Sequence, residues 1–270
     1  MKIQTLSASI RGGIAWMPVF MSVAIFPSNA CLLAQDLNLS PTRPTVANSV
    51  TMQNRRVLQI ETGYDAFPQK IPGNSQTFDT TLTYTPLTRL RLDFGWSSWN
   101  HRESGGEATN GVGTIGVGGK IEIRKDRPRF PALGLQYGAE LPTASESSLQ
   151  GYGQQIILIL NHHYGKEGKF NVIVNGSMIQ SDCRTREGCT YGGQQSIAMA
   201  YRLQKKTRLY AEVFGQNVPQ SNAPPGTYFF TGLFHQFTDA FGINGGMRFG
   251  LTDHSASVGT TIGLVFGKRL

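Results

Sequence analysis

Histidine and serine residues are the first candidates for catalysis, because a hydrolase needs a nucleophile, a base and a polar residue within mutual reach. His101 and His254 fall in polar loops, and no Gly-x-Ser-x-Gly nucleophile elbow is present. His162 and His163 are adjacent in an extended segment, so they are expected to point to opposite faces, which argues against a shared metal ion. The sequence therefore predicts no catalytic residue, no metal site and no cofactor, and we expect a protein that is not an enzyme.

Glycine and cysteine patterns are the next candidates. The run from Gly111 to Gly116 matches a dinucleotide-binding pattern by letter. It leads into a strand-like segment, so a pyrophosphate would find no helix N-terminus, and we count the match as chance. Cys183 and Cys189 lie in one polar segment that offers few further ligands for a metal. Outside the cytoplasm, this pair is expected to form a disulfide.

The elements that would position any site are strands, and the clearest ones are at the end of the chain. Between residues 241 and 252, apolar residues occupy one phase of a two-residue period and small or polar residues occupy the other. The pattern resumes at 258–266 after a short polar break. Successive side chains of a strand point to opposite faces, so each segment has one apolar and one small-polar face. A terminal hairpin of this kind is what the closure of a membrane barrel requires.

The same alternation recurs along the chain and predicts twelve strands. They lie at 58–64, 77–84, 89–96, 115–124, 133–141, 153–162, 170–178, 194–201, 208–214, 227–237, 241–252 and 257–266. The segments at 153–162 and 227–237 are apolar on both faces, so their phase stays open.

The connections between these strands alternate in length. Those near residues 86, 127, 166, 205 and 239 are short, whereas those near 70, 105, 147, 187 and 221 are long. Only the last connection, at 252–256, breaks this alternation, because it is short. An even strand number with short turns at one end and long loops at the other is typical of an outer-membrane barrel with both termini in the periplasm. The predicted fold is therefore all-β, an antiparallel up-and-down transmembrane β-barrel over residues 55–270.

Aromatic residues support a membrane barrel over a soluble β-sandwich. Trp96 and Tyr228 fall near the loop end of their strands, and Tyr84 and Phe170 fall near the turn end. Two aromatic girdles that flank an apolar band are a signature of membrane barrels. A soluble sandwich predicts neither the girdles nor the alternating loop lengths.

Charged residues of the predicted strands fall in the polar phase. A Lys or Arg that faced lipid near the bilayer centre would cost about 2–4 kcal/mol, so these side chains are expected to face the lumen. They either pair across the lumen and partly plug it, brace it for stability alone, or line a narrow wet path that selects among solutes. The predicted lumen-lining residues are Glu61, Asp79, Arg89, Arg91, Asp93, Lys120, Glu122, Arg124, Glu140, Arg208, Glu212 and Arg248.

Residues 1–34 are typical of a secretory signal peptide, because basic residues accompany a mostly apolar run at 14–26. That run is too short for a membrane helix. Cleavage after Ala34 is slightly favoured over cleavage after Ala30, and acylation of Cys31 is a further alternative. Each of these interpretations takes the chain out of the cytoplasm.

Composition limits the remaining classes. The chain has 270 residues, of which 39% are hydrophobic, and a formal charge of +8. The densest basic run, Lys205-Lys206, is interpreted as an exposed turn, and we expect no nucleic-acid partner. Residues 35–54 are polar, contain Pro41 and Pro44, and are predicted to form a periplasmic lead-in without regular structure. The sequence does not decide whether this segment enters the barrel as a plug.

Three stretches carry a resemblance to a known family. They are Arg43-Pro44, the first strand from Val57 to Tyr64, and Thr252-Asp253-His254 before the closing strand. With these features the chain resembles the outer-membrane transporter-like barrels of the MetA-pathway phenol-degradation family. The resemblance covers most of the mature chain but is a pattern of strands rather than a sharp motif. It implies passage of small solutes, including aromatic or hydrophobic compounds.

The sequence therefore favours an outer-membrane channel or transporter of a Gram-negative bacterium, exported with the help of its signal peptide. Its expected partners are outer-membrane lipid, a small-molecule solute and, during biogenesis, the barrel-assembly machinery. The alternative is a barrel with a closed lumen and a structural, adhesive or lipase-like role.

Overall fold

The structure is a computed structural model that describes residues 37–69, 73–104, 107–145, 151–183, 188–217, 225–253, 255 and 258–270. The predicted signal peptide and His254 lie outside the described residues. The strands are β1 (Val57–Gln69), β2 (Gly73–Leu87), β3 (Leu90–Ser104), β4 (Glu107–Gly111), β5 (Ile115–Arg124), β6 (Ala132–Leu141), β7 (Tyr152–Tyr164), β8 (Phe170–Cys183), β9 (Thr190–Gln204), β10 (Thr207–Gln216), β11 (Gly226–Thr238), β12 (Phe241–Gly250) and β13 (Val258–Arg269). A short 3-10 turn, η2 (Lys166–Gly168), joins β7 to β8. Within these ranges, no helix has the length and apolar character needed to cross a membrane.

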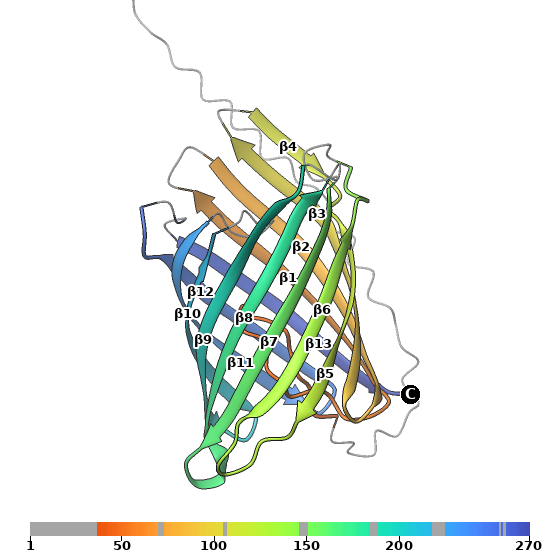
Figure 1. Cartoon of the computed structure of the whole chain (residues 1–270), viewed down its shortest axis with the longest axis vertical. Helices are drawn as coiled ribbons and strands as arrows, with labels where there is room; N and C mark the ends of the chain where they lie inside the picture. The colour runs from red at the N-terminus through yellow and green to blue at the C-terminus, as the bar shows by residue number, and fades with distance from the viewer. Residues whose placement is uncertain are drawn as a thin grey trace, which may run out of the picture. The chain divides into compact units, whose positions relative to one another are not determined.

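The strands close into one antiparallel barrel. Each wall strand pairs with the next, β2 also pairs with β3, and β1 pairs with β13, so that Val57 lies opposite Arg269. β4 pairs with the last residues of β3 and stands outside this circuit, which leaves twelve strands in the wall (Figure 1). The predicted all-β, twelve-stranded antiparallel barrel is therefore confirmed.

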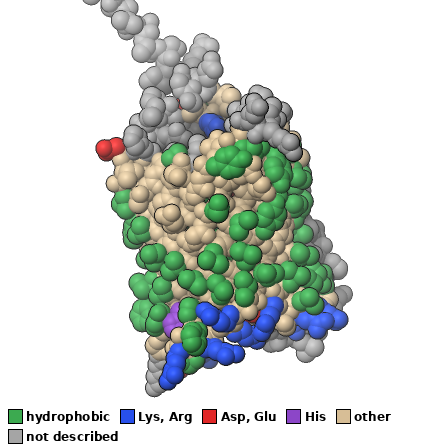
Figure 2. Space-filling view, in the orientation of Figure 1, with side chains coloured by type: hydrophobic (Ala, Val, Ile, Leu, Met, Phe, Trp, Pro, Cys, Tyr) green, Lys and Arg blue, Asp and Glu red, His purple; other side chains and the backbone are tan. Residues whose placement is uncertain are grey.

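The two phases of each strand have opposite surroundings. On β12, the Asn244 side chain is 1% exposed, whereas Met247 in the other phase is 43% exposed. Leu92 and Ile262 are likewise exposed apolar residues on the outer face. Figure 2 shows hydrophobic side chains spread over this outer wall. An apolar outside and a polar inside are the arrangement of a membrane barrel.

The structure assigns the two strands whose phase the sequence left open. On β7, Ile157 and Ile159 are buried inside, whereas Ile156 and Leu158 are each 49% exposed on the outer face. On β11, the buried phase contains Tyr228, Phe230 and Phe234. Both strands therefore present apolar side chains to the interior, and the reason is found in residues 37–54, which pack against them.

Two predicted loops are wrong in part, because strands continue into them. The predicted loop at 65–76 is largely strand, since β1 pairs with β2 as far as Gln69 opposite Gly73. The predicted polar loop at 100–110 contains the end of β3 and β4, and it places His101 in a strand opposite Asn110. Strand pairing satisfies backbone donors and acceptors whatever the side chains are. These extensions have polar residues in both phases, so they show no alternation of apolar and polar residues from which a strand could be predicted.

Neighbouring residues on β2 provide a test of the two faces. Leu82 lies in the outer phase and Thr81 in the inner phase, near the middle of the strand. We expect Leu82→Lys to destabilise the barrel by about 2–4 kcal/mol, because the ammonium group would face hydrocarbon. The matched variant Thr81→Lys should lose much less. Urea titration of folding into phosphatidylcholine vesicles measures both, and equal losses would contradict the assignment of faces.

Candidate functional site

Residues 37–54, called the inner segment below, lie against the inner face of the barrel. Leu37 and Leu39 are buried in a cluster with Val57, Phe234 and Val265. Ala47 and Val50 are buried in a second cluster, whose wall members are Ala132, Ile157, Ile159, Ile173 and Ala198. The inner segment has no regular secondary structure. It is held by apolar packing at several points, so it occupies part of the barrel interior.

Two glycines of the wall let the inner segment approach closely. A Cβ atom added at Gly267 would lie 2.5 Å from the Leu39 side chain, and one added at Gly63 would lie 2.9 Å from the Arg43 guanidinium. Both distances are shorter than Cβ contacts normally reach, so a side chain at either position would have to displace Leu39 or Arg43.

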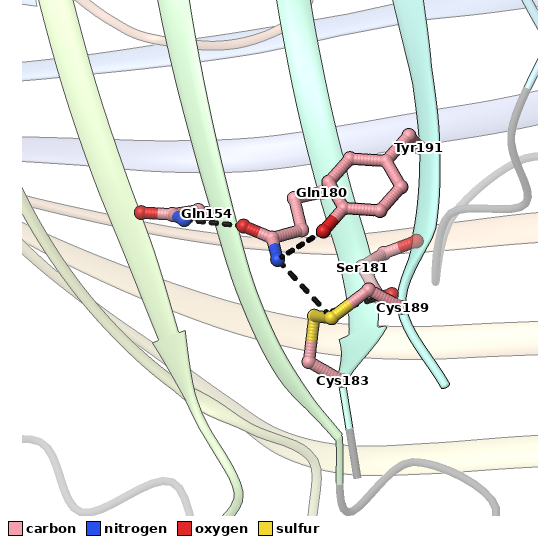
Figure 3. Close-up of a disulfide and its surroundings, with 6 residues drawn as sticks. All are labelled: Gln154, Gln180, Ser181, Cys183, Cys189 and Tyr191. Carbon is pink, nitrogen blue, oxygen red and sulfur yellow. Dashed lines mark hydrogen bonds between the residues drawn. A yellow bond between two sulfur atoms is a disulfide. The ribbon is translucent and has the colours of Figure 1, made fainter. Parts of the chain in front are cut away.

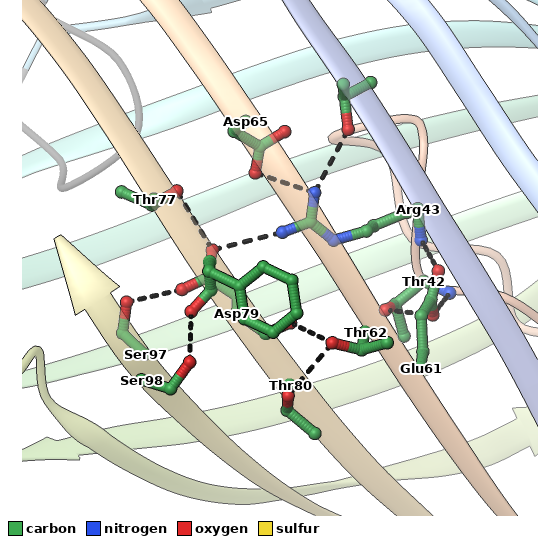
Figure 4. Close-up of polar contacts among 12 residues, drawn as sticks. Thr42, Arg43, Glu61, Thr62, Asp65, Thr77, Asp79, Thr80, Ser97 and Ser98 are labelled. Carbon is green, nitrogen blue, oxygen red and sulfur yellow. Dashed lines mark hydrogen bonds and ion pairs between the residues drawn. The ribbon is translucent and has the colours of Figure 1, made fainter. Parts of the chain in front are cut away.

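Glu61 of β1 is the first polar anchor of the inner segment. Its carboxylate accepts hydrogen bonds from the backbone N–H groups of Thr42 and Arg43, at 2.7 and 3.1 Å, and from the Thr42 hydroxyl at 2.8 Å. The Asn244 side-chain amide donates a further bond at 2.8 Å. Glu61 is 2% exposed, so these donors take the place of the water molecules that the carboxylate loses on burial. Figure 4 shows Thr42 and Arg43 beside Glu61.

The Arg43 guanidinium is the second anchor, and it crosses between two wall strands. It lies 2.7 Å from the Asp65 carboxylate of β1 and 3.1 Å from the Asp79 carboxylate of β2. It also donates to the Thr261 hydroxyl at 3.1 Å. Figure 4 shows Arg43 reaching from the inner segment into the space between Asp65 and Asp79. A guanidinium with partly buried partners on both sides forms charge-assisted bonds that are stronger than those of an exposed pair.

Glu212 of β10 repeats the arrangement of Glu61 at a wall strand that is separated from β1 by β13, β12 and β11. It accepts hydrogen bonds from the backbone N–H groups of Val46 at 2.9 Å and Ala47 at 2.6 Å. The Asn175 side chain on β8 both accepts from the N–H and donates to the carbonyl of Asn48. Glu212 and Asn175 thus satisfy backbone groups that no strand partner satisfies.

Lys120 of β5 anchors the next part of the inner segment, Ser49 to Thr51. Its Nζ donates to the backbone carbonyls of Ser49 at 2.5 Å and Thr51 at 3.2 Å, and the side chain is 1% exposed. Beside it, Arg91 pairs with Asp93 on β3 at 2.7 Å. Cations, carboxylates and amides of the wall therefore bind the inner segment mainly through its backbone.

An aromatic cluster with one cation lies inside the barrel beside the inner segment. The Arg248 guanidinium lies 4.6 Å from the ring centre of Phe67 and 4.9 Å from that of Phe214. Phe214 stacks on Tyr228, and both belong to a buried cluster with Phe230 that contacts Val46. The interior thus combines polar anchors with an apolar, π-rich surface.

The predicted lumen residues fall into two groups in the structure. Several lie on the inner face, either in contact with the inner segment or close beside those contacts. Of these, Glu61, Arg91, Lys120, Glu212 and Arg248 are buried, and Asp79 and Asp93 are half-buried. The others lie toward the strand ends, outside these contacts; these are Arg89, Glu122, Arg124, Glu140 and Arg208. Arg89, Arg124 and Glu140 are exposed. A pocket of about 330 Å³ lies between residues 50–55 and the wall near Glu122.

Sequence reasoning missed several residues of this site. Asp65 was assigned to a loop, and Asn161 and Asn175 were not singled out although they bond to Ser49 and Asn48. Inner-phase Asn residues on otherwise apolar strands were the available signal. Nothing in the sequence identifies Arg43 as the partner of two carboxylates, because its partners are distant in the chain.

The two adjacent histidines do not separate as predicted. The Nδ1 atoms of His162 and His163 lie 2.6 and 2.8 Å from the two carboxylate oxygens of Asp126, which is in the turn after β5. The prediction of opposite faces is wrong here because the pair lies close to the end of β7, beside this turn. Burial alone would raise the pKa of Asp126, but hydrogen bonds from both histidines outweigh it and hold that pKa below its ordinary value.

The predicted disulfide between Cys183 and Cys189 is present. The Gln180 side-chain amide of β8 donates to the Cys189 sulfur at 3.1 Å and to the Tyr191 hydroxyl at 3.2 Å (Figure 3). The disulfide thus ties the end of β8 to the start of β9 at the loop end of the barrel.

A closed antiparallel barrel with an apolar outer face and polar residues on its inner face has the fold of an outer-membrane β-barrel. The fold is similar to the COG4313 outer membrane channel from Pseudomonas putida F1, with a TM-score of 0.60 and 14% identity over 78% of this chain and 94% of that one. It is also similar to the KdgM porin in complex with disordered oligogalacturonate, with a TM-score of 0.53 and 8% identity over 77% and 98%. No family model matches the chain, and no curated protein matches its sequence significantly.

Proposed function

We propose that the protein is an outer-membrane channel for small solutes, and that the inner segment must move before a solute passes. The observation that carries this proposal is how the inner segment is held. Its backbone is bound by side chains of the wall, such as Glu61, Glu212 and Lys120, and not by strand pairing. Such bonds can be exchanged for water one at a time, whereas adding or removing a strand would open the barrel. The similar folds, one a channel and one a porin, support the proposal.

The interior supports aromatic or hydrophobic compounds as solutes. Phe67, Phe214, Tyr228 and Arg248 would offer ring faces and one cation to a solute once the inner segment moves. Aromatic rings stack on such faces, and an Arg can pair with an anionic substituent. The resemblance to the MetA-pathway phenol-degradation family agrees with this substrate class, and we propose membership of that family. The charged residues predicted for the lumen would line the polar part of the path.

The proposal also has consequences for location. The barrel would reside in the outer membrane of a Gram-negative bacterium after removal of its signal peptide, with both termini and the short turns in the periplasm. Outer-membrane lipid would surround it, and the barrel-assembly machinery would insert it. No catalytic role is proposed for any residue.

One observation favours a second function, that of a closed barrel with a structural, adhesive or lipase-like role. The inner segment buries Leu37, Leu39, Ala47 and Val50 against apolar wall residues, and this packing opposes any movement. A barrel that is closed permanently would have the same contacts.

Single-channel recording separates the two functions. The refolded protein in a planar bilayer is expected to show infrequent, discrete openings, because each opening requires loss of several buried contacts. Benzoate in the bath should change the frequency or the current of these openings, and acetate serves as the control. A barrel that is folded by its heat-modifiable gel mobility but remains electrically silent would support the closed-barrel function instead.

A further inference from the structure

The end of the barrel that bears the short turns is strongly basic. Lys and Arg residues occur at 55–56, 89, 124–129, 169, 205–206 and 268–269, and all of them are exposed. Here they are called the basic collar. Figure 2 shows Lys and Arg side chains gathered at this end, directly beyond the band of hydrophobic side chains.

Few acidic residues of the turns balance the basic collar. Asp126 and Asp239 lie in turns of this end, and Glu167 lies in η2. Asp126 is already hydrogen-bonded to two histidines. The distances from the Lys206 nitrogen to the Asp239 carboxylate and from the Arg202 guanidinium to the Glu167 carboxylate are both 3.9 Å. Exposed pairs at such distances neutralise little charge. The collar therefore presents net positive charge to its surroundings.

The opposite end of the barrel has a different character. Its described residues include the acidic Glu103, Glu140 and Asp253 together with Arg102. A general excess of basic residues over the whole surface therefore does not explain the collar. The asymmetry follows the axis of the barrel, which is the direction in which a membrane protein meets two different surfaces.

The collar is arranged around the barrel rather than on one side. Its members belong to the ends of β1, β5 and β13 and to the turns between β2 and β3, β5 and β6, β7 and β8, and β9 and β10. A globular partner would contact one side of such a ring. A lipid leaflet surrounds the whole ring and can meet all of its charges at once.

Exposed aromatic residues lie at the same level as the collar. Phe130, Tyr164, Phe170 and Phe237 are between 42% and 56% exposed at this end, and the Arg124 guanidinium lies 5.5 Å from the ring centre of Phe130. Aromatic side chains beside cations are suited to the boundary between acyl chains and headgroups. The surface thus offers apolar contact and positive charge to the same lipid molecule.

We infer that the basic collar binds the anionic headgroups of phospholipids in the leaflet that surrounds the short-turn end. Each Lys or Arg near an anionic membrane surface contributes about 1 kcal/mol, and the attraction extends over about one Debye length. The collar would enrich phosphatidylglycerol-type lipids around the barrel and fix its depth in the membrane. This inference is independent of whether the barrel conducts solutes.

Lipid selectivity measured by electron paramagnetic resonance tests the inference. The full mature protein is refolded into phosphatidylcholine vesicles that contain spin-labelled phosphatidylglycerol or spin-labelled phosphatidylcholine, and the motionally restricted fraction of each label is compared. We expect at least about a twofold preference for phosphatidylglycerol in about 0.05 M salt. Most of that preference should be lost in about 1 M salt, because salt screens the attraction between exposed cations and anionic headgroups.

Matched variants assign the preference to the collar. Lys169→Gln, Lys205→Gln, Lys206→Gln and Lys268→Gln together remove four of the twelve cations of the basic collar and should clearly lower the preference, whereas Lys→Arg at the same four positions should retain it in full. Arg102→Gln at the loop end should leave it unchanged. Heat-modifiable mobility confirms that each variant is folded. The inference is overturned if the wild-type protein shows no preference, or if the folded Lys→Gln variant keeps it.

Discussion

Removal of residues 37–52 is expected to raise the single-channel conductance of the refolded barrel severalfold and to replace brief openings with long ones. The inner segment contacts the wall from Glu61 on β1 to Glu212 on β10, so its loss removes chain from the interior and uncovers both the polar anchors and the aromatic surface. Planar-bilayer recording measures the change directly. Flux of benzoate into vesicles should rise in parallel, because the Phe67–Arg248 surface would then face water.

The barrel itself should survive this deletion. Its wall is closed by main-chain pairing from β1 to β13, and that pairing does not involve the inner segment. A second variant, in which residues 42–49 are replaced by a Gly-Ser sequence of equal length, keeps the chain length and removes the Arg43 side chain. It should give an intermediate conductance. If the folded deletion variant conducts no better than the wild type, occlusion by the inner segment is not what limits passage.

The fold could be predicted from sequence because membrane burial imposes a strict two-residue period. Residues such as Met247 and Asn244 have opposite environments, and their types show it. The prediction failed where the membrane imposes no difference between the two faces of a strand. The extension of β3 and its pairing with β4 lie among polar residues on both phases, and there the sequence shows no contrast between the faces.

Only those residues of the candidate site that lie on the wall strands could be predicted from the sequence. Glu61, Lys120 and Glu212 stand out as charges in the inner phase of apolar strands. Their partners do not stand out, because these residues bind mainly backbone N–H and C=O groups of the inner segment, which every residue has. Arg43 contacts Asp65 because the inner segment lies inside the closed barrel. Sequence patterns carry no information on contacts between segments that are placed together only by the fold.

The strength of the Glu212 anchor can be measured through a single cysteine. Ala47 is 4% exposed and its backbone N–H donates to Glu212 at 2.6 Å. In an Ala47→Cys variant of the chain that begins at Gln35, the new thiol is buried and is therefore expected to react slowly with a maleimide reagent. Cys183 and Cys189 are joined and do not compete. Addition of Glu212→Ala should accelerate labelling at least about tenfold, because each hydrogen bond to a charged group contributes about 1.5–3 kcal/mol.

Two controls separate release of the inner segment from general loosening of the barrel. Glu212→Gln retains a side-chain oxygen that can accept one of the two backbone N–H groups, so its labelling rate should be intermediate. Glu140→Ala removes an inner-face carboxylate that, among the described residues, makes no hydrogen bond with the inner segment, and its rate should match that of Ala47→Cys alone. Equal labelling rates in the Glu212→Ala and Glu140→Ala backgrounds would show that Glu212 does not hold the segment. A fast labelling rate for Ala47→Cys alone, in a folded barrel, would mean that the inner segment leaves the interior even when its anchors are intact. The contacts at Glu61 and Arg43 would then be too weak to hold the segment inside the barrel.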